Sequence, residues 1–214
     1  MIETRLVHHT IVPEKTALLV IDVTHDFVDV GAPMQIPMAQ EILPRLQGVA
    51  QACRKAGGYV AYCGYTYQEQ AMERMDDFWP PIQKGALAPE TVGIQVVDEV
   101  RPEIGDLIIE KNTYSVFHGT PLEEELRNRG VDTVIVSGVA INYACYLTAR
   151  EAQCRNFKVI FLSDGCCTFE LPDMGLGAVS IEDVQKTFLT TIAYGCGHVM
   201  SSKEAIDKLE AGGG

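Results

Sequence analysis

Residues 134–152 read Val-Ile-Val-Ser-Gly-Val-Ala-Ile-Asn-Tyr-Ala-Cys-Tyr-Leu-Thr-Ala-Arg-Glu-Ala. The run opens with three β-branched apolar residues, which favour a strand buried on both faces. Gly138 then allows a tight turn, and the remaining residues have the spacing of a helix. A strand, a glycine turn and a helix in this order predict the repeating unit of a parallel α/β sheet.

The same alternation extends in both directions along the chain. Apolar runs predict strands at residues 17–22, 59–62, 106–110, 133–137, 158–162 and 197–200. Periodic apolar positions predict helices at 40–56, 121–129, 142–156, 181–194 and 203–210. We therefore expect an α/β fold, a single doubly wound, Rossmann-like domain with a six-stranded parallel sheet flanked by helices. It spans residues 1–214, with residues 1–12 and 211–214 peripheral.

Local signals predict where one helix begins and where loops lie. Thr120 is the expected N-cap of the helix at 121–129, and Glu123 completes a capping box with it. Residues 68–93 and 166–177 lack periodicity and are expected to be irregular. Loops that follow the carboxyl ends of strands are where sheets of this kind bind ligands.

The charge and composition of the chain indicate which binding partners and which cellular compartment to expect. The chain carries a formal net charge of −12, so we expect neither nucleic acid nor a membrane to bind it. Its longest apolar run, residues 17–21, is too short to span a bilayer, and residues 1–16 lack the apolar region of a secretory signal. Seven cysteines, an odd number without a Cys-x-x-Cys pair, indicate a reduced, cytoplasmic protein.

Two charged residues close predicted strands. Asp22 ends the first strand and Lys111 follows the third, so both belong to the carboxyl edge of the sheet. Asp22 alone is as consistent with ordering the next loop as with catalysis. Lys111 alone is more often a surface residue whose stem covers apolar neighbours. Close together, the two would form a pair that tunes proton transfer.

A third position lies at the start of the helix that follows Gly138. A nucleophile there would lie in the positive field of the helix N-terminus, which lowers the pKa of a thiol. The backbone N–H groups of the same turn would stabilise an oxyanion. The turn therefore has the properties of a site for covalent catalysis.

Together these segments resemble the isochorismatase-like (cysteine hydrolase) family. The matching motifs are Asp after the first strand, Lys before Tyr-Ser-x-Phe-x-Gly-Thr, and Gly-Val-Ala before a helix, in a resemblance that runs from residue 17 to residue 206. It implies an Asp–Lys–Cys triad that cleaves amide, carbamoyl and related bonds. Asp22 resembles its general base, and Lys111 resembles the cation that supports the thiolate. Val139–Ala140 resembles a non-proline cis peptide that aims an N–H group into the oxyanion hole.

The chain departs from this family at the nucleophile. The family's cysteine stands six residues after the glycine, and six residues after Gly138 is Ala144. The family's Thr/Ser-Ala-x-Asp-Ala pattern aligns with residues 148–152 in the same register. Cys145 is one residue away, about 100° around a helix, so it should face elsewhere. Three interpretations stay open: an engineered Cys→Ala variant, which we favour because the other motifs remain, a natural pseudoenzyme, and a shifted site at Cys145.

Further residues are candidate substrate contacts. Asn142 and Gln185 resemble residues that face the substrate in ureidoacrylate and biuret hydrolases, although a place on the helix surface explains Gln185 equally well. Four aromatic residues are expected to wall the pocket, each with an ordinary place in the core as the alternative: Phe27, Trp79, Tyr114 and Phe117.

We expect no metal and no cofactor. Nicotinamidases of this family carry an Asp-x-His motif after the second strand, where residues 63–69 read Cys-Gly-Tyr-Thr-Tyr-Gln-Glu. The five histidines are scattered, and only the adjacent His8 and His9 lie close together in the sequence.

The resemblance thus implies an amidohydrolase that cleaves a C–N bond in a small linear amide, ureido or carbamoyl compound, here inactive at Ala144. One alternative is a catalytically dead protein that only binds such a ligand. Another is an isochorismatase-type vinyl-ether hydrolase that uses Asp22 without a cysteine. The resemblance also implies a homo-oligomer, either a dimer or a tetramer.

Overall fold

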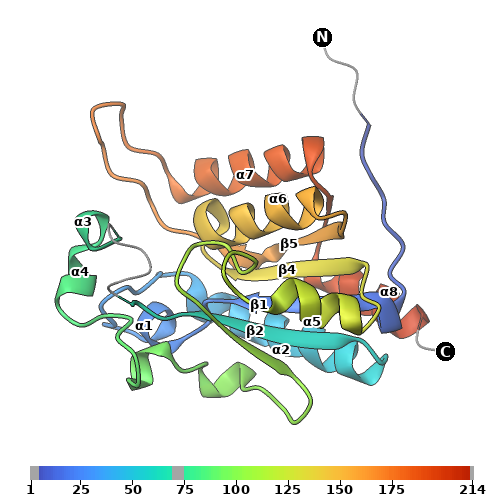
Figure 1. Cartoon of the computed structure of the whole chain (residues 1–214). Coiled ribbons are helices and arrows are strands. Elements are labelled where there is room, and N and C mark those ends of the chain that lie inside the picture. Colours follow the sequence, from blue (N-terminus) through green and yellow to red (C-terminus); the bar gives the residue numbers. More distant parts are fainter. Residues whose placement is uncertain (1–4, 69–74, 213–214) are drawn as a thin grey trace.

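The computed structural model describes residues 5–68 and 75–212, and these residues contain a six-stranded sheet of order β3-β2-β1-β4-β5-β6 (Figure 1). Its strands are β1 (Thr16–Ile21), β2 (Tyr59–Tyr65), β3 (Leu107–Lys111), β4 (Thr133–Val139), β5 (Lys158–Cys167) and β6 (His198–Met200). Every neighbouring pair is parallel. The predicted fold class is therefore confirmed, and the order is that of a doubly wound dinucleotide-binding sheet.

Four strands run further toward the carboxyl edge than the sequence predicts, β3 by one residue to Lys111. β2 continues to Tyr65, β4 to Val139 and β5 to Cys167. The prediction that the irregular stretch starts at residue 166 is wrong, because Gly138 pairs with Cys166 and Val139 with Cys167 after a shift in register. The polar residues Ser163 and Asp164 interrupt the apolar run, and backbone pairing carries the strand past them.

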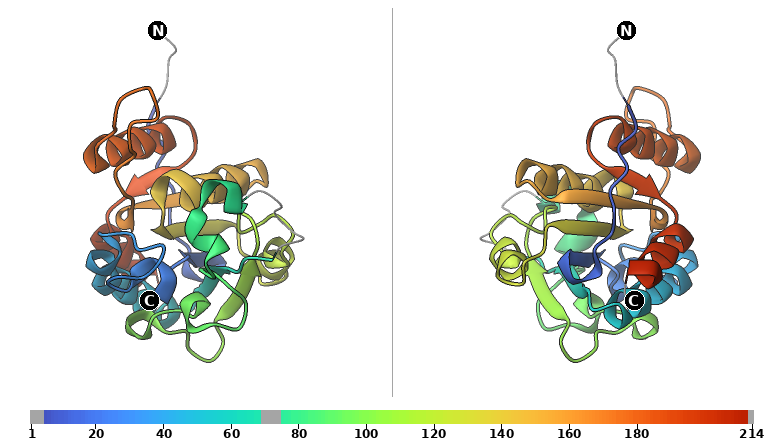
Figure 2. Two further views of the ribbon diagram at one scale, coloured as in Figure 1. Left: turned by 90° about the vertical axis from the view of Figure 1, so that its left-hand side faces the viewer. Right: turned by 90° about the vertical axis from the view of Figure 1, so that its right-hand side faces the viewer.

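Helices cover both faces of the sheet (Figures 1 and 2). On one face lie α2 (Ala39–Lys55) and α8 (Ser202–Gly212), and on the other lie α5 (Leu122–Asn128), α6 (Tyr146–Cys154) and α7 (Ile181–Gly195). Three short helices precede or follow β2 in the chain: α1 (His25–Val28), α3 (Met75–Phe78) and α4 (Pro80–Gln83). No helix in the described ranges combines the length and the apolar character that a bilayer crossing requires.

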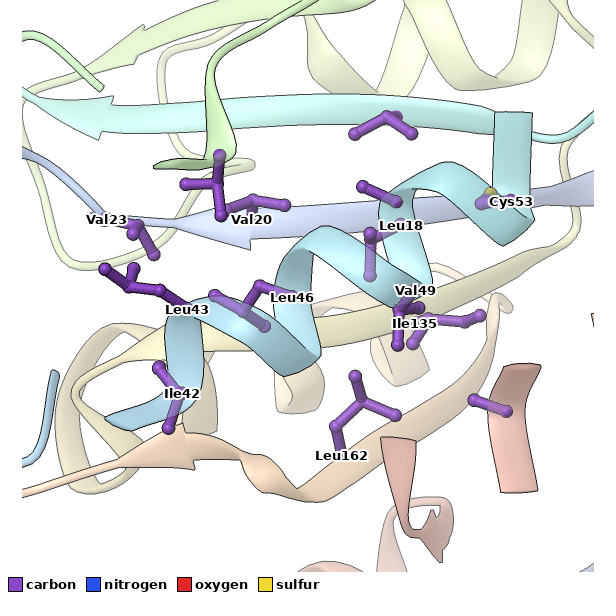
Figure 3. Packing of buried hydrophobic residues seen from close by; sticks show 14 of the residues in the cluster. Leu18, Val20, Val23, Ile42, Leu43, Leu46, Val49, Cys53, Ile135 and Leu162 are labelled. Atoms are coloured by element: carbon purple, nitrogen blue, oxygen red, sulfur yellow. The ribbon is translucent and has the colours of Figure 1, made fainter. Parts of the chain in front are cut away.

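Successive side chains of β1 point to opposite faces of the sheet and so belong to two different core clusters. Leu18 and Val20 point toward α2, where they pack with Leu46 and neighbouring apolar residues (Figure 3). Leu19 and Ile21 belong to the cluster under α5, α6 and α7. A strand with both faces covered must be apolar throughout, which is why β1 shows no polar alternation. Each such side chain contributes about 1.5–3 kcal/mol through its burial.

Two local predictions about helix starts need correction. The N-cap position of α5 is Pro121 rather than Thr120. The Thr120 hydroxyl still accepts a hydrogen bond from the Leu122 N–H at 3.3 Å, and it donates to the carbonyl of Val116. Glu123 pairs with Arg155 and does not complete a capping box. The helix predicted at 142–156 begins instead with a π-helical turn, Ile141–Cys145, which leads directly into α6.

Gly138 is required where β1 and β4 pass each other. Its φ is +115°, and a Cβ atom there would lie 2.1 Å from the carbonyl oxygen of Ile21. We expect Gly138→Ala to lower the free energy of unfolding by about 3 kcal/mol or more, because the two strands must separate.

The matched control for this substitution is Gly130→Ala. Gly130 also has a positive φ, +71°, but no described atom lies within 4 Å of its Cβ position. This substitution should cost only about 1 kcal/mol, the strain of the left-handed conformation. Urea unfolding of both variants measures the difference, and equal losses would contradict a steric role for Gly138.

Candidate active site

The site lies at the carboxyl edge of the sheet, where the strand order changes direction between β1 and β4. Asp22 directly follows β1 and adopts φ +54°, and Gly138 pairs with Ile21 across the edge. The peptide bond between Val139 and Ala140, at the end of β4, is cis. Parallel pairing thus brings together residues more than a hundred positions apart in the sequence.

Asp22 and Lys111 form a buried ion pair. Lys111 Nζ lies 2.8 Å from Asp22 Oδ2, and the two side chains are 0% and 6% exposed. The ammonium group also donates to the carbonyl oxygen of Thr113 at 3.2 Å and lies 5.0 Å from the centroid of the Tyr65 ring. Lys111 is therefore not a snorkelling surface residue. Its charge contacts the Asp22 carboxylate, the Thr113 carbonyl oxygen and the Tyr65 ring.

The remaining oxygen of Asp22 is available for chemistry. Oδ1 is buried and has no hydrogen-bond partner within the described part of the chain. Burial raises the pKa of Asp22 above its usual range, and the Lys111 ammonium and a backbone hydrogen bond from Tyr65 oppose this effect. A carboxyl group with a raised pKa and one unpaired oxygen is suited to taking up or giving up a proton.

Lys111→Met is expected to destabilise the protein in a pH-dependent way. Without the cation, the pKa of Asp22 rises further, because burial is left with less opposition. A carboxyl group whose pKa is raised in the folded state costs no stability when the pH is below its unfolded-state pKa, about 4. The cost grows as the pH rises from there to the folded-state pKa, and it is complete above that value. The loss should therefore be about 3 kcal/mol near neutral pH and smaller at about pH 4.

Lys158→Met is the control for that measurement. Lys158 pairs with Asp132 at 2.9 Å, but both side chains are substantially exposed. Breaking this pair should cost at most about 1 kcal/mol. Urea unfolding across the pH range compares the two variants, and a loss in Lys111→Met that does not change with pH would contradict the coupling to Asp22.

A cavity of about 520 Å³ opens beside this ion pair. Its lining includes Asp22, Val139, Ala140 and Ala144. Residues 32–37 and the segment around α3 and α4 supply other parts of its wall. The lining is mostly apolar and aromatic, which is typical of small-molecule sites of this size.

Ala144, and not Cys145, belongs to the cavity. Ala144 lines it from the π-helical turn that follows the cis peptide. Cys145 is fully buried in the core beneath α6, beside Cys166, and burial raises its pKa well above the usual value. A neutral thiol packed in the core is a poor nucleophile, so the structure does not favour a shifted site at Cys145.

Three of the aromatic residues singled out from the sequence lie at the cavity. Phe27, Trp79 and Tyr114 all line it, and Trp79 Nε1 donates a hydrogen bond to the Tyr114 hydroxyl at 2.9 Å. Phe117 does not line it, because its ring stacks on Phe157 in the core near α5.

Asn142 and Gln185 are not among the residues that line the cavity. Asn142 Oδ1 accepts a hydrogen bond from the Thr168 hydroxyl at 2.6 Å. Gln185 Nε2 donates to the carbonyl oxygens of Ser163 and Cys166, which ties α7 to β5. Both amides therefore hold parts of the scaffold around the site, whereas Gln185 Oε1 is buried without a hydrogen-bond partner among the described residues.

Other cavity residues were not predicted from the sequence. Tyr143 and Phe169 line the cavity, as do Tyr65 at the end of β2 and the exposed Glu170. Tyr143 lies next to Ala144, and Phe169 follows the end of β5, so position at the carboxyl edge was the available signal. Within the described residues, no cluster of three or more His, Cys, Asp or Glu side chains is arranged to hold a metal ion.

Comparisons with known proteins show the family and the fold to which the chain is similar. The Isochorismatase domain model matches residues 16–204. Nicotinamidase 3 of Arabidopsis thaliana is 30% identical over 86% of this chain and 83% of its own length. The crystal structure of a cysteine hydrolase from Pseudomonas syringae pv. phaseolicola 1448A superposes with a TM-score of 0.94 at 35% identity, covering 99% of this chain and 100% of that one.

A second solved structure is more distant in sequence. N-carbamoylsarcosine amidase from Thermoplasma acidophilum superposes with a TM-score of 0.71 at 28% identity, covering 88% of this chain and 96% of that one. The family model covers all six strands, Asp22, Lys111 and the turn that carries Ala144. The chain therefore belongs to the isochorismatase family, whose members are hydrolases.

Proposed function

We propose that this site is built to hydrolyse the C–N bond of a small amide or carbamoyl compound, with Ala144 in the place of the attacking cysteine. The observation that carries the proposal is the position of Ala144. It lines the cavity together with Asp22, at the start of the helical segment that follows the cis peptide. A thiol there would have a general base and a helix N-terminus beside it.

The chemistry follows from a cysteine at position 144. Asp22 takes the thiol proton, and the sulfur attacks the carbonyl carbon of the substrate. The N–H groups of Ala140 and of residue 144 stabilise the oxyanion, and Lys111 balances the charge on Asp22. The C–N bond breaks, and ammonia or an amine leaves with the proton. Water then cleaves the thioester, giving up a proton to Asp22 and releasing the acid.

The chain with Ala144 lacks the atom that this sequence of steps requires. A methyl group cannot attack a carbonyl carbon, so we infer binding of the amide without its turnover. This state fits both an engineered Cys→Ala variant and a natural pseudoenzyme. The test is ammonia release from neutral amides by the chain as it stands and by Ala144→Cys. Release only after the substitution supports the proposal, and release by neither contradicts it.

A second candidate is vinyl-ether hydrolysis by Asp22 without a thiol. The buried, unpaired Oδ1 atom and the raised pKa of Asp22 favour it, because a protonated carboxyl can protonate the carbon–carbon double bond. The pH dependence separates the candidates. Amide hydrolysis needs Asp22 ionised, so its rate rises as the pH increases through the pKa of Asp22. Vinyl-ether cleavage needs Asp22 protonated, so its rate falls over the same range.

A further inference from the structure

The cavity contains an aromatic corner, made of Trp79, Tyr143 and Phe169. The rings of Tyr143 and Phe169 are nearly parallel, at 12°, with centroids 5.9 Å apart. The Trp79 ring stands at 75° to the first and 85° to the second, with centroid distances of 5.6 and 6.2 Å. Two nearly parallel rings and a third across them present flat apolar surface to a ligand in the cavity.

The charged side chains that the described residues bring to the cavity are unfavourable for an anion. Among the described residues that line it, none is Lys, Arg or His, whereas Asp22 and Glu170 both carry carboxyl groups. Lys111 lies behind Asp22 and is already paired with it. A second carboxylate, brought in by a ligand, would lose its water without gaining a cation, which costs much binding free energy.

We propose, building on the amide-hydrolase function above, that the substrate class is an uncharged amide or carbamoyl compound with a bulky, flat apolar group. The amide lies against Ala144 and Asp22, and the apolar group lies in the aromatic corner. Carbamoyl amino acids and other anionic ureido compounds are disfavoured, because Asp22 and Glu170 both line the cavity. A cavity of about 520 Å³ also accommodates more than a minimal linear amide.

The chain with Ala144 allows this preference to be measured as binding alone. Trp79 is the single tryptophan, so its fluorescence reports a ring that enters the corner. The probes are acetamide, benzamide and 4-carbamoylbenzoate, which differ by a ring and by one carboxylate. Benzamide should bind at least about tenfold more tightly than acetamide and at least about tenfold more tightly than 4-carbamoylbenzoate. Calorimetric titration checks the affinities independently of fluorescence.

Two pairs of variants test which residues set the preference. Phe169→Leu should weaken benzamide binding roughly three- to tenfold. The control is Phe188→Leu on α7, where the partly buried Phe188 ring packs against Tyr146 of α6, and it should leave benzamide binding unchanged. Glu170→Gln should reduce the discrimination against 4-carbamoylbenzoate roughly threefold or more, whereas Glu124→Gln, an exposed position on α5, should not.

Each outcome decides the proposal. Equal or tighter binding of the anionic probe, no binding of any probe, or equal effects of a variant and its control would overturn it. Failure of the hydrolase function is a separate result, since benzamide would then bind with the expected preference while Ala144→Cys released no ammonia from it.

Discussion

Ala144→Cys is expected to turn a protein without detectable amide hydrolysis into an amidase. Loss of an enzyme's nucleophile removes on the order of 10⁴- to 10⁶-fold of rate, so its restoration should return a comparable factor. The other groups that the reaction requires are present, because Asp22 and both residues of the cis peptide line the same cavity as Ala144. Ammonia release from benzamide measures the rate, and intact-mass spectrometry should detect the acyl-enzyme.

Ala149→Cys is the matched control for this substitution. Ala149 is buried in the core on α6 and does not line the cavity, so a thiol there adds sulfur without a site. It should release no ammonia. Cys145→Ala in the restored protein should leave the rate within a few-fold, about threefold at most, because Cys145 faces the core. Ammonia release by the unaltered chain that Cys145→Ala abolishes would contradict the assignment of position 144.

Asp22→Asn in the restored protein is expected to have the second largest effect. An amide side chain cannot take the thiol proton, so kcat/KM should fall by about 10²- to 10⁴-fold. Asp29→Asn serves as the control, because Asp29 is an exposed partner of His25 that does not line the cavity. It should change kcat/KM by less than about twofold.

The pH profile shows whether Asp22 acts as a base or only holds the structure. With Asp22 present, kcat/KM should rise with pH through a pKa above the ordinary carboxyl value, about 4, because burial raises it. In the Asp22→Asn variant, that acidic limb should disappear, along with most of the rate. A merely structural role would lower the rate at every pH and leave the shape of the profile unchanged.

Much of the fold could be predicted because parallel sheets leave a local signal. Strands buried on both faces must be apolar throughout, so β1 and β4 are visible as continuous apolar runs in the sequence. The edge strands β3 and β6 are partly exposed and leave shorter runs. The carboxyl ends of strands were underestimated where polar residues interrupt the run, as at Ser163 in β5. There the backbone pairing with β4, which depends on another strand, decides where the strand ends.

The residues of the candidate site also fall into those that the sequence could predict and those that only the packing places. Asp22 and Lys111 were recognisable because they close apolar runs, and position 144 was recognisable from its distance to Gly138. Asn142 and Gln185 were expected at the substrate, yet their amides hold Thr168 and β5. Sequence spacing predicts which turn carries a side chain. Which hydrogen-bond partner that side chain finds depends on the neighbouring segments in the folded structure.

The sequence by itself determined the α/β class and the order of the motifs, and it led to the proposal that Ala144 stands in the cysteine's position, because each depends on residues that are close together in the chain. The tertiary structure decided that Asp22 and Lys111 are in contact and that Trp79, Tyr143 and Phe169 meet in one corner. These residues come from separate strand ends, turns and loops, and only the packing of those segments at one edge of the sheet brings them together.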